Sequence, residues 1–255
     1  MTALSINLNK IALIRNSRDT LYPDVVKHAQ MCIDAGAHGI TVHPRPDQRH
    51  IRADDCFALA KAIDVELNIE GNPFAPPMAS DRPGVSDYPG FMTLIRQIKP
   101  AQCTLVPDSN SQLTSDHGFD LKQDFNRLQP IIDELKSLGV RSSLFMDPID
   151  DQIELAAKLG ADRIELYTGP YAEAVDTGGD IDASIAQFAQ AAKTAKKCGL
   201  GLNAGHDLNT QNLPLFCRHL PHLLEVSIGH SFTIDCIEVG LQQAIANYLA
   251  ALSTR

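Results

Sequence analysis

The sequence contains no run of roughly 18 or more apolar residues, so it offers no candidate for a membrane-crossing helix. Residues Met1 to Lys10 also lack the cationic flank and the long apolar stretch of a secretory signal. Basic residues are outnumbered, since 22 lysines and arginines face 31 aspartates and glutamates, which gives a formal net charge of −9. A general nucleic-acid binder is therefore not expected, because it needs a basic face to neutralise phosphates. Small anionic substrates are not excluded, because local cations and helix N-termini can outweigh net charge inside a cleft.

The cysteines form no CxxC pair and show no other metal or redox signature. In a chain of 255 residues, scattered cysteines predict small buried hydrophobes in a reducing compartment. We therefore expect a cytoplasmic protein. The six residues are Cys32, Cys56, Cys103, Cys198, Cys217 and Cys236.

Short, β-branched apolar runs alternate with longer amphipathic stretches along the whole chain, in which hydrophobic residues make up 44%. The short runs predict strands because their apolar residues are consecutive and β-branched. The longer stretches predict helices because their apolar residues recur at helical spacing. The predicted strands are Leu4–Leu8, Gly39–His43, Glu66–Ile69, Gln102–Val106, Ser142–Met146, Arg163–Tyr167, Gly201–Asn203 and Leu224–Ile228. The predicted helices are Pro23–Ala35, Asp54–Ile63, Tyr88–Ile98, Leu121–Leu138, Asp151–Leu159, Ile181–Cys198, Gln211–His219 and Thr233–Leu252.

Eight β–α units in a chain of this length favour an α/β fold that closes as a (β/α)8 TIM barrel, with residues 1–255 as one domain. Gly36, Gly139, Gly160 and Gly199 support this reading, because each follows a helical stretch and glycine readily adopts the left-handed C-cap conformation. No GxGxxG motif follows the first strand, which removes the main support for a dinucleotide-binding fold.

Two segments are predicted to be loops at the end of the barrel that carries the active site. The segment Gly71–Tyr88 contains four prolines and cannot continue as a helix. The segment Pro107–Gly118 is rich in polar, turn-forming residues, which suits a mobile lid. A plain surface loop has the same composition, so both interpretations of Pro107–Gly118 stay open.

Polar residues gather where the predicted strands end, which is where (β/α)8 barrels place their chemistry. His43, His206 and His230 each stand just past a strand, and Glu70 and Glu165 stand at strand ends as well. Cations lie close to the first two strands, at Lys10, Arg15, Arg18, Arg45 and Arg49. The remaining histidines lie on or beside predicted helices and are interpreted as structural: His28, His38, His117, His219 and His222.

Two chemistries fit this ring of side chains. The first is acid–base catalysis on an anionic substrate, with histidines and carboxylates moving protons and cations holding charge. The backbone at Gly229 and His230, which opens a helix, would hold a phosphate. The second is a metal-dependent hydrolase with Glu70 or Glu165 among its ligands, but neither HxH nor HExxH occurs and no metal is expected. A non-catalytic phosphate-binding barrel is a third alternative, although it has no use for so many proton carriers.

Several blocks of the sequence resemble the pyridoxine 5′-phosphate synthase family of vitamin B6 biosynthesis. The resemblance runs in order from residue 4 to about residue 245. Its most specific block is Gly39–Ile51, and the first is Ile6–Arg18. Shorter matches are Asn68-Ile69-Glu70, Leu105-Val106-Pro107, Ser143-Leu144-Phe145, Ile164–Gly169, Leu202–His206 and Ile228-Gly229-His230.

The resemblance implies a (β/α)8 barrel that needs no metal or organic cofactor. The implied reaction condenses 3-amino-2-oxopropyl phosphate with 1-deoxy-D-xylulose 5-phosphate, giving pyridoxine 5′-phosphate, inorganic phosphate and water. His43 and Glu70 are implied as general bases, His206 as general acid and Glu165 as the group that stabilises the transition state. The implied aminoketone phosphate site is Asn7, Arg18, Gly229 and His230 with the backbone of Asp207, and the deoxyxylulose phosphate site is Asn9, Lys10, Arg45, His50 and Thr114. A homo-octamer is implied as well.

The chain departs from many members of this family at four positions. Asn9-Lys10 stands where Asp-His is common, and Asp19 and Asp207 stand where glycine is common. An aspartate beside a phosphate would be repulsive unless its side chain turns away. The segment Gly71–Tyr88 also looks longer than in many relatives.

Overall fold

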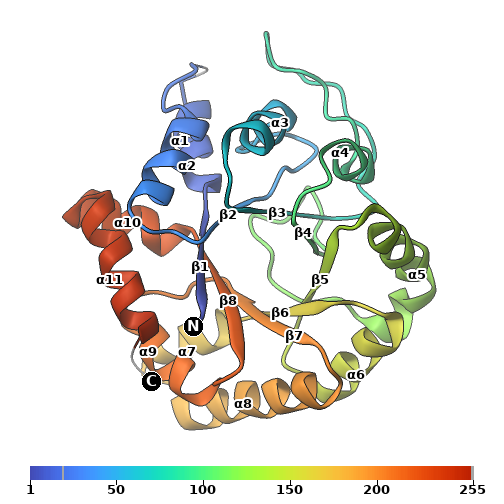
Figure 1. Cartoon of the computed structure of the whole chain (residues 1–255), viewed down its shortest axis with the longest axis vertical. Coiled ribbons are helices and arrows are strands. Elements are labelled where there is room, and N and C mark those ends of the chain that lie inside the picture. Colours follow the sequence, from blue (N-terminus) through green and yellow to red (C-terminus); the bar gives the residue numbers. More distant parts are fainter. Residues whose placement is uncertain (19, 254–255) are drawn as a thin grey trace.

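The computed structural model describes residues 1–18 and 20–253, which form a closed barrel of eight parallel strands surrounded by helices (Figure 1). Each strand pairs with its sequence neighbours, and β8 closes the barrel against β1. The strands are β1 Ala3–Asn7, β2 Gly39–Val42, β3 Glu66–Gly71, β4 Gln102–Leu105, β5 Arg141–Met146, β6 Arg163–Tyr167, β7 Gly201–Gly205 and β8 Leu223–Ile228. All eight predicted strands and the predicted fold are confirmed, with ends that differ by no more than two residues.

The described helices are α1 Asn9–Asn16, α2 Val25–Asp34, α3 Ala53–Ala62, α4 Phe91–Ile98, α5 Leu121–Leu138, α6 Asp150–Leu159, α7 Gly169–Thr177, α8 Ile181–Lys197, α9 Leu213–His219, α10 His230–Val239 and α11 Leu241–Ser253. The prediction of one continuous helix over Thr233–Leu252 is wrong, because Gly240 adopts a φ of +84° and separates α10 from α11. Helices α1 and α7 were not predicted at all. The predicted glycine stops are confirmed at Gly139 and Gly160, which cap α5 and α6 in the left-handed conformation.

The interior of the barrel is polar, whereas most barrels of this class fill theirs with branched aliphatic side chains. Gln102 on β4 donates a hydrogen bond to Glu225 on β8 at 3.2 Å, and these strands are not neighbours in the sheet. Their side chains therefore meet across the inside of the barrel. Asn68, Thr104 and Asn203 are buried there too, and Thr104 donates to Asn68 at 3.0 Å.

The apolar side chains of the strands point outward, into the layer between the sheet and the helices. On β3, for example, Leu67 and Ile69 alternate with Asn68 and Glu70, as the two-residue period of a strand requires. This outer layer is the hydrophobic core, and it includes four of the six cysteines: Cys32, Cys56, Cys103 and Cys217. Their burial agrees with the interpretation of these cysteines as small hydrophobes.

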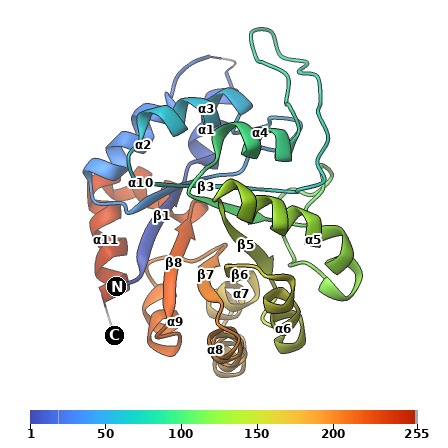
Figure 2. The same ribbon diagram turned by 45° about the vertical axis from the view of Figure 1, so that its right-hand side comes forward.

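The two predicted loops both follow strands at the carboxyl end of the barrel. The segment 71–88, drawn in teal before α4, extends away from the barrel and carries no helix (Figure 2). Its two arms are joined where Met78 and Tyr88 exchange backbone hydrogen bonds at 2.9 and 2.8 Å. In the described part of the chain, no helix is both long and apolar enough to span a bilayer.

Candidate active site

A cavity of about 430 Å³ opens at the carboxyl ends of the strands, where the sequence predicts the site. Every predicted site residue except Arg18 lines it: Asn7, Asn9, Lys10, His43, Arg45, His50, Glu70, Thr114, Glu165, His206, Asp207, Gly229 and His230. Arg18 is exposed beyond the end of α1 and does not belong to the lining. Its predicted role in phosphate binding has no support from the cavity of this single chain.

His43 stands between two carboxylates at the floor of the cavity. Its Nε2 lies 3.1 Å from Oδ2 of Asp108, and its Nδ1 lies 3.8 Å from Oε2 of Glu70. All three side chains are buried. Burial alone would raise the pKa of Asp108, but His43 and Arg45 hold it below its ordinary value. Asp108 therefore stays ionised and gives His43 a fixed anionic partner.

Glu70 and Glu165 are buried carboxyl groups, and within residues 1–18 and 20–253 neither forms an ion pair with a lysine or an arginine. Burial raises the pKa of Glu70 well above its ordinary value, and the negative charges of Glu165, Glu225 and Asp108 add to the effect. Burial, followed by the charge of Glu225, raises the pKa of Glu165 from 4.5 to about 8. Glu165 is consequently a neutral acid at neutral pH, and Glu70 holds its proton more tightly than an ordinary glutamate.

The backbone at Gly205 makes room for Glu165. A Cβ atom at this position would overlap Oε1 of Glu165, so a larger residue on β7 would force this carboxyl group to move. Gly205 pairs in register with Tyr167, two residues beyond Glu165 on β6. Because β6 and β7 are paired neighbours, the carboxyl group of Glu165 occupies the space beside Gly205.

Arg45 is buried beneath the segment 107–118. Its Nη2 lies 2.7 Å from Oδ2 of Asp108, and its Nη1 donates to the carbonyl oxygens of Ser109 and Gln112 at 2.8 and 3.1 Å. Arg49 donates to the carbonyl oxygens of Asn110 and Gln112 from the same side. Two guanidinium groups thus hold the segment over the cavity, which favours its interpretation as a lid.

His50 lies against these cations and takes the neutral form. Burial lowers its pKa well below the ordinary value, and the charges of His43, Arg45, Arg49 and Lys10 lower it further. Its Nδ1 accepts the backbone N–H of Ile51 at 2.9 Å. The proton of the neutral ring therefore sits on Nε2, so His50 can donate a hydrogen bond but supplies no positive charge.

Asn7 and Asn9 fix the backbone where β1 passes into α1. The side-chain oxygen of Asn7 accepts the N–H of Asn9, and that of Asn9 accepts the N–H of His43, both at 2.9 Å. Asn9 therefore ties the first strand end to the second. Lys10, in the first turn of α1, lines the cavity beside them.

His206 and Asp207 form a turn directly after β7. Nδ1 of His206 lies 2.6 Å from Oδ2 of Asp207, and its Nε2 lies 2.8 Å from Oγ1 of Thr114 in the lid. The hydrogen bond from His206 is the main cause that lowers the pKa of Asp207. The side chain of Asp207 thus turns toward His206, as expected if only its backbone lies beside a phosphate. Asp19, the other residue that stands where glycine is common, lies outside the described residues.

The last predicted element of the site is the start of α10. Gly229 is its N-cap and His230 its first residue. A Cβ atom at Gly229 would approach the Cβ atom of Asn7 to 3.0 Å, so the strand ends of β1 and β8 come together here because this residue is glycine. The first N–H groups of α10 are available to an anion, as at other helix N-termini.

Two charged residues beside the cavity, Asp108 and Arg49, were not predicted as site residues. Asp108 lies in the polar segment Pro107–Gly118, and Arg49 was predicted only as a cation after the second strand. No local pattern marks either of them, because their roles arise from the way the lid folds back over β2.

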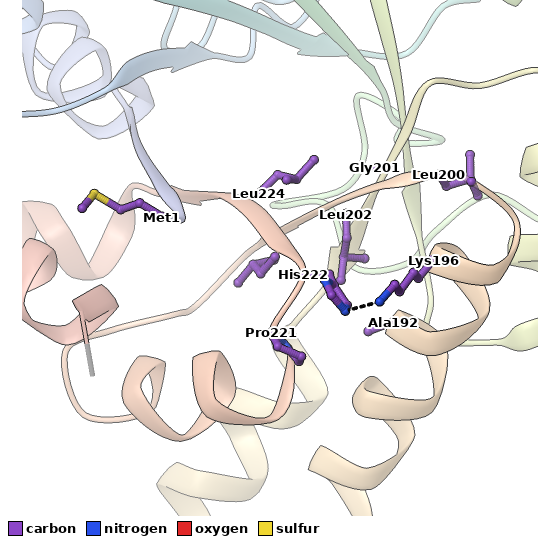
Figure 3. Close-up of a pocket in the computed structure, with 11 residues that line it drawn as sticks. Met1, Ala192, Lys196, Leu200, Gly201, Leu202, Pro221, His222 and Leu224 are labelled. Carbon is purple, nitrogen blue, oxygen red and sulfur yellow. Dashed lines mark hydrogen bonds between the residues drawn. The ribbon is translucent and has the colours of Figure 1, made fainter. Parts of the chain in front are cut away.

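A second hollow, of about 500 Å³, lies at the opposite end of the barrel (Figure 3). Its lining is mostly apolar or backbone, and Nζ of Lys196 lies 2.7 Å from Nε2 of His222 at its edge. It contains no carboxylate and none of the predicted site residues. Across residues 1–18 and 20–253, no group of three or more histidines, cysteines, aspartates or glutamates is arranged to hold a metal ion.

The sequence is similar to one known family along nearly its whole length. Residues 4–254 match the model of the family described as pyridoxal phosphate biosynthesis protein PdxJ. A pyridoxine 5′-phosphate synthase from Xanthomonas campestris pv. campestris (strain B100) is 55% identical over 255 residues, covering 99% of this chain and 96% of the relative. Another, from Xylella fastidiosa (strain 9a5c), is 51% identical over 256 residues, covering 99% and 95%.

Solved structures that share the fold are far less similar in sequence. Tryptophan synthase from M. tuberculosis matches with a TM-score of 0.63 at 8% identity, over 98% of this chain and 92% of that one. A phosphoribosylanthranilate isomerase from Thermotoga maritima matches with a TM-score of 0.54 at 10% identity, over the full length of both chains. These likenesses support the barrel fold alone.

Proposed function

The chain belongs to the pyridoxal phosphate biosynthesis protein PdxJ family, and we propose that its cavity catalyses the pyridoxine 5′-phosphate synthase reaction. The substrates would be 3-amino-2-oxopropyl phosphate and 1-deoxy-D-xylulose 5-phosphate, and the products pyridoxine 5′-phosphate, inorganic phosphate and water. The observation that carries this proposal is the meeting of four proton carriers in one cavity: His43, Glu70, Glu165 and His206.

The reaction joins an amine to a ketone, expels phosphate and water, and closes an aromatic ring, so protons move at every stage. Groups with separated pKa values are needed for such a sequence. In our proposal His43, held by the anionic Asp108, and Glu70 act as general bases, and His206 acts as general acid. The raised pKa of Glu70 supports this assignment, because a carboxylate that binds its proton tightly is a strong base once the proton has left. Glu165, a neutral acid, would donate a hydrogen bond that stabilises the transition state.

Two phosphorylated substrates need two anion sites. The first would be the start of α10, where the backbone of Gly229 and His230 offers N–H groups and Asn7 lies alongside. The second would be formed by Lys10, Arg45, His50 and Thr114, with Asn9 beside them. Because His50 is neutral, the positive charge of this second site would come from Lys10 and Arg45.

The lid supports a reaction that must exclude water. Thr114 reaches His206 across the cavity, and Arg45 holds the carbonyl oxygens of the lid on the other side. Enclosure of this kind keeps water from reactive imines and strengthens electrostatic interactions inside the cavity.

One assay tests the proposal against both alternatives. Protein treated with a chelator is mixed with the two substrates, and pyridoxine 5′-phosphate and inorganic phosphate are measured. We expect both products without added metal. Phosphate release without pyridoxine 5′-phosphate, lost with the chelator and restored by zinc or manganese, would identify a metal hydrolase instead. Binding of both substrates without release of phosphate would identify a non-catalytic binder.

Two further expectations belong to this proposal. We place the protein in the cytoplasm, because a small-molecule biosynthetic enzyme whose cysteines form no disulfide in the described part of the chain suits a reducing compartment. We also propose a homo-octamer, as the family resemblance implies. The molar mass in solution tests the assembly directly, since one chain is 27.8 kDa.

A further inference from the structure

Asp207 occupies a backbone conformation that disfavours it. Its φ is +58°, and that of His206 before it is +86°, both in the left-handed region that favours glycine. A strained turn persists only where the surroundings fix it. Here Thr168 donates to the carbonyl oxygens of Gly205 and His206, and Asn212 donates to that of Asp207 at 3.1 Å.

The strained turn aims the Asp207 carboxylate at the imidazole of its neighbour. With Oδ2 of Asp207 2.6 Å from Nδ1 of His206, the carboxylate accepts a proton held on Nδ1. Nε2 of the same ring then faces Oγ1 of Thr114, at 2.8 Å, and the cavity. Nδ1–H of the neutral ring therefore points to Asp207, and the proton gained on charging sits on Nε2.

We propose that Asp207 is a positioning residue for His206: its carboxylate fixes the tautomer and ring orientation that put the transferable proton of the general acid on the cavity side. This inference rests on the proposed function and adds a residue to it. The backbone of Asp207 was expected to contact a phosphate. The side chain of Asp207 contacts His206 instead and orients its ring.

Other groups hold His206 and Asp207 in this arrangement. The ring of Tyr167 on β6 packs edge-on to His206, with centroids 5.2 Å apart. The hydrogen bond from His206 lowers the pKa of Asp207, so Asp207 stays ionised and accepts the Nδ1–H of the ring.

Two variants separate the charge of Asp207 from its geometry. Asp207→Asn keeps an acceptor oxygen but removes the charge, and Asp207→Gly removes the partner and relaxes the turn. We expect Asp207→Asn to lower kcat about fivefold, because a neutral amide oxygen accepts the Nδ1–H less strongly than a carboxylate does. Asp207→Gly should lower kcat further with no loss of thermal stability. Neither variant should raise the KM for either phosphate, since both remove a negative charge from the cavity.

The lid supplies a matched control. Nδ1 of His117 lies 2.6 Å from Oδ1 of Asp116, the same type of contact, and neither residue lines the cavity. Asp116→Asn should leave the tautomer of His206 unchanged. A structural readout is long-range 1H–15N NMR of the histidine rings, with His206 assigned through His206→Gln. We expect the Nδ1–H tautomer of neutral His206 in the natural protein and loss of that preference in Asp207→Gly.

The inference is overturned if Asp207→Gly retains the natural kcat, or if neutral His206 carries its proton on Nε2 in the natural protein. Both results are distinguishable from failure of the proposed function, in which the natural protein itself makes no pyridoxine 5′-phosphate.

Discussion

Replacing Glu165 by glutamine should make the folded protein more stable at neutral pH while it abolishes activity. Burial and the nearby Glu225 raise the pKa of Glu165 from 4.5 to about 8. Oε2 of this side chain has no hydrogen-bond partner in the described part of the chain. The folded chain therefore keeps the carboxyl group neutral at pH 7, whereas the unfolded chain ionises it near pH 4.5.

The size of the effect follows from proton linkage. A carboxyl pKa that is raised in the folded state means that unfolding releases a proton, so the group costs stability increasingly as pH rises. With folded and unfolded values of about 8 and 4.5, the cost is about 1 kcal/mol at pH 5, about 3 kcal/mol at pH 7 and about 4 kcal/mol at pH 8. Glutamine has nearly the same shape and no ionisable proton, so it removes this cost.

The measurement is the free energy of unfolding in urea, for the natural protein and Glu165→Gln, at pH 5, 7 and 8. The advantage of the variant should widen by about 3 kcal/mol between pH 5 and pH 8. Glu66→Gln is the control of opposite sign, because a hydrogen bond from Arg141 lowers the pKa of Glu66 and ionised Glu66 stabilises the fold above pH 4.5. That variant should be less stable than the natural protein at pH 7 and 8. A difference for Glu165→Gln that stays constant across this range would refute the reasoning.

Three further substitutions test the roles assigned in the cavity. Glu70→Gln should lower kcat by about a hundredfold or more with little change in either KM, and near-natural turnover would remove Glu70 from the mechanism. Arg45→Lys should raise the KM for deoxyxylulose phosphate more than that for the aminoketone phosphate, because an ammonium group cannot span Asp108 and the lid carbonyls in the planar, two-pronged way of arginine. Equal effects on both substrates would count against this placement. Lys10→His should make the KM for deoxyxylulose phosphate rise between about pH 6 and 8, where histidine loses its charge, and KM–pH curves that superimpose on the natural ones would show that residue 10 does not touch the phosphate.

The strands were predictable because each is a short apolar run bounded by a turn or a capping glycine. Helices α1 and α7 were not, for local reasons. Only Leu8 separates β1 from α1, so the pattern of α1 merges with the strand end. Helix α7 opens with Gly169-Pro170, which resembles a turn although proline is well tolerated in the first turn of a helix. The break between α10 and α11 depends on a single backbone conformation, at Gly240.

The candidate site was predictable as far as side chains stand at strand ends. The topology of a parallel barrel brings all those ends to one face, so the order of the strands alone gathers His43, Glu70 and His206. Asp108 lies outside this rule, because its place beside His43 depends on how the lid returns over the cavity. The position of Arg18 is a second limit, since nothing in the sequence shows that it lies outside the cavity of its own chain.

The polar interior of the barrel explains why the acids at its mouth can be so strongly perturbed. The alternation Glu66-Leu67-Asn68-Ile69-Glu70 already carries the signal, because a strand buried on both faces is ordinarily apolar throughout. Deep in the barrel the amide groups of Gln102 and Asn203 donate to Glu225, and Arg163 lies 4.0 Å from its carboxylate. Glu70 and Glu165, nearer the mouth, have no arginine or lysine beside them in the described part of the chain, and Glu70 contacts only Asn68 and His43 among polar side chains there. The barrel therefore sets Glu225 behind two buried carboxyl groups, and this arrangement loses stability at neutral pH and supplies strong bases at the place where the substrates meet.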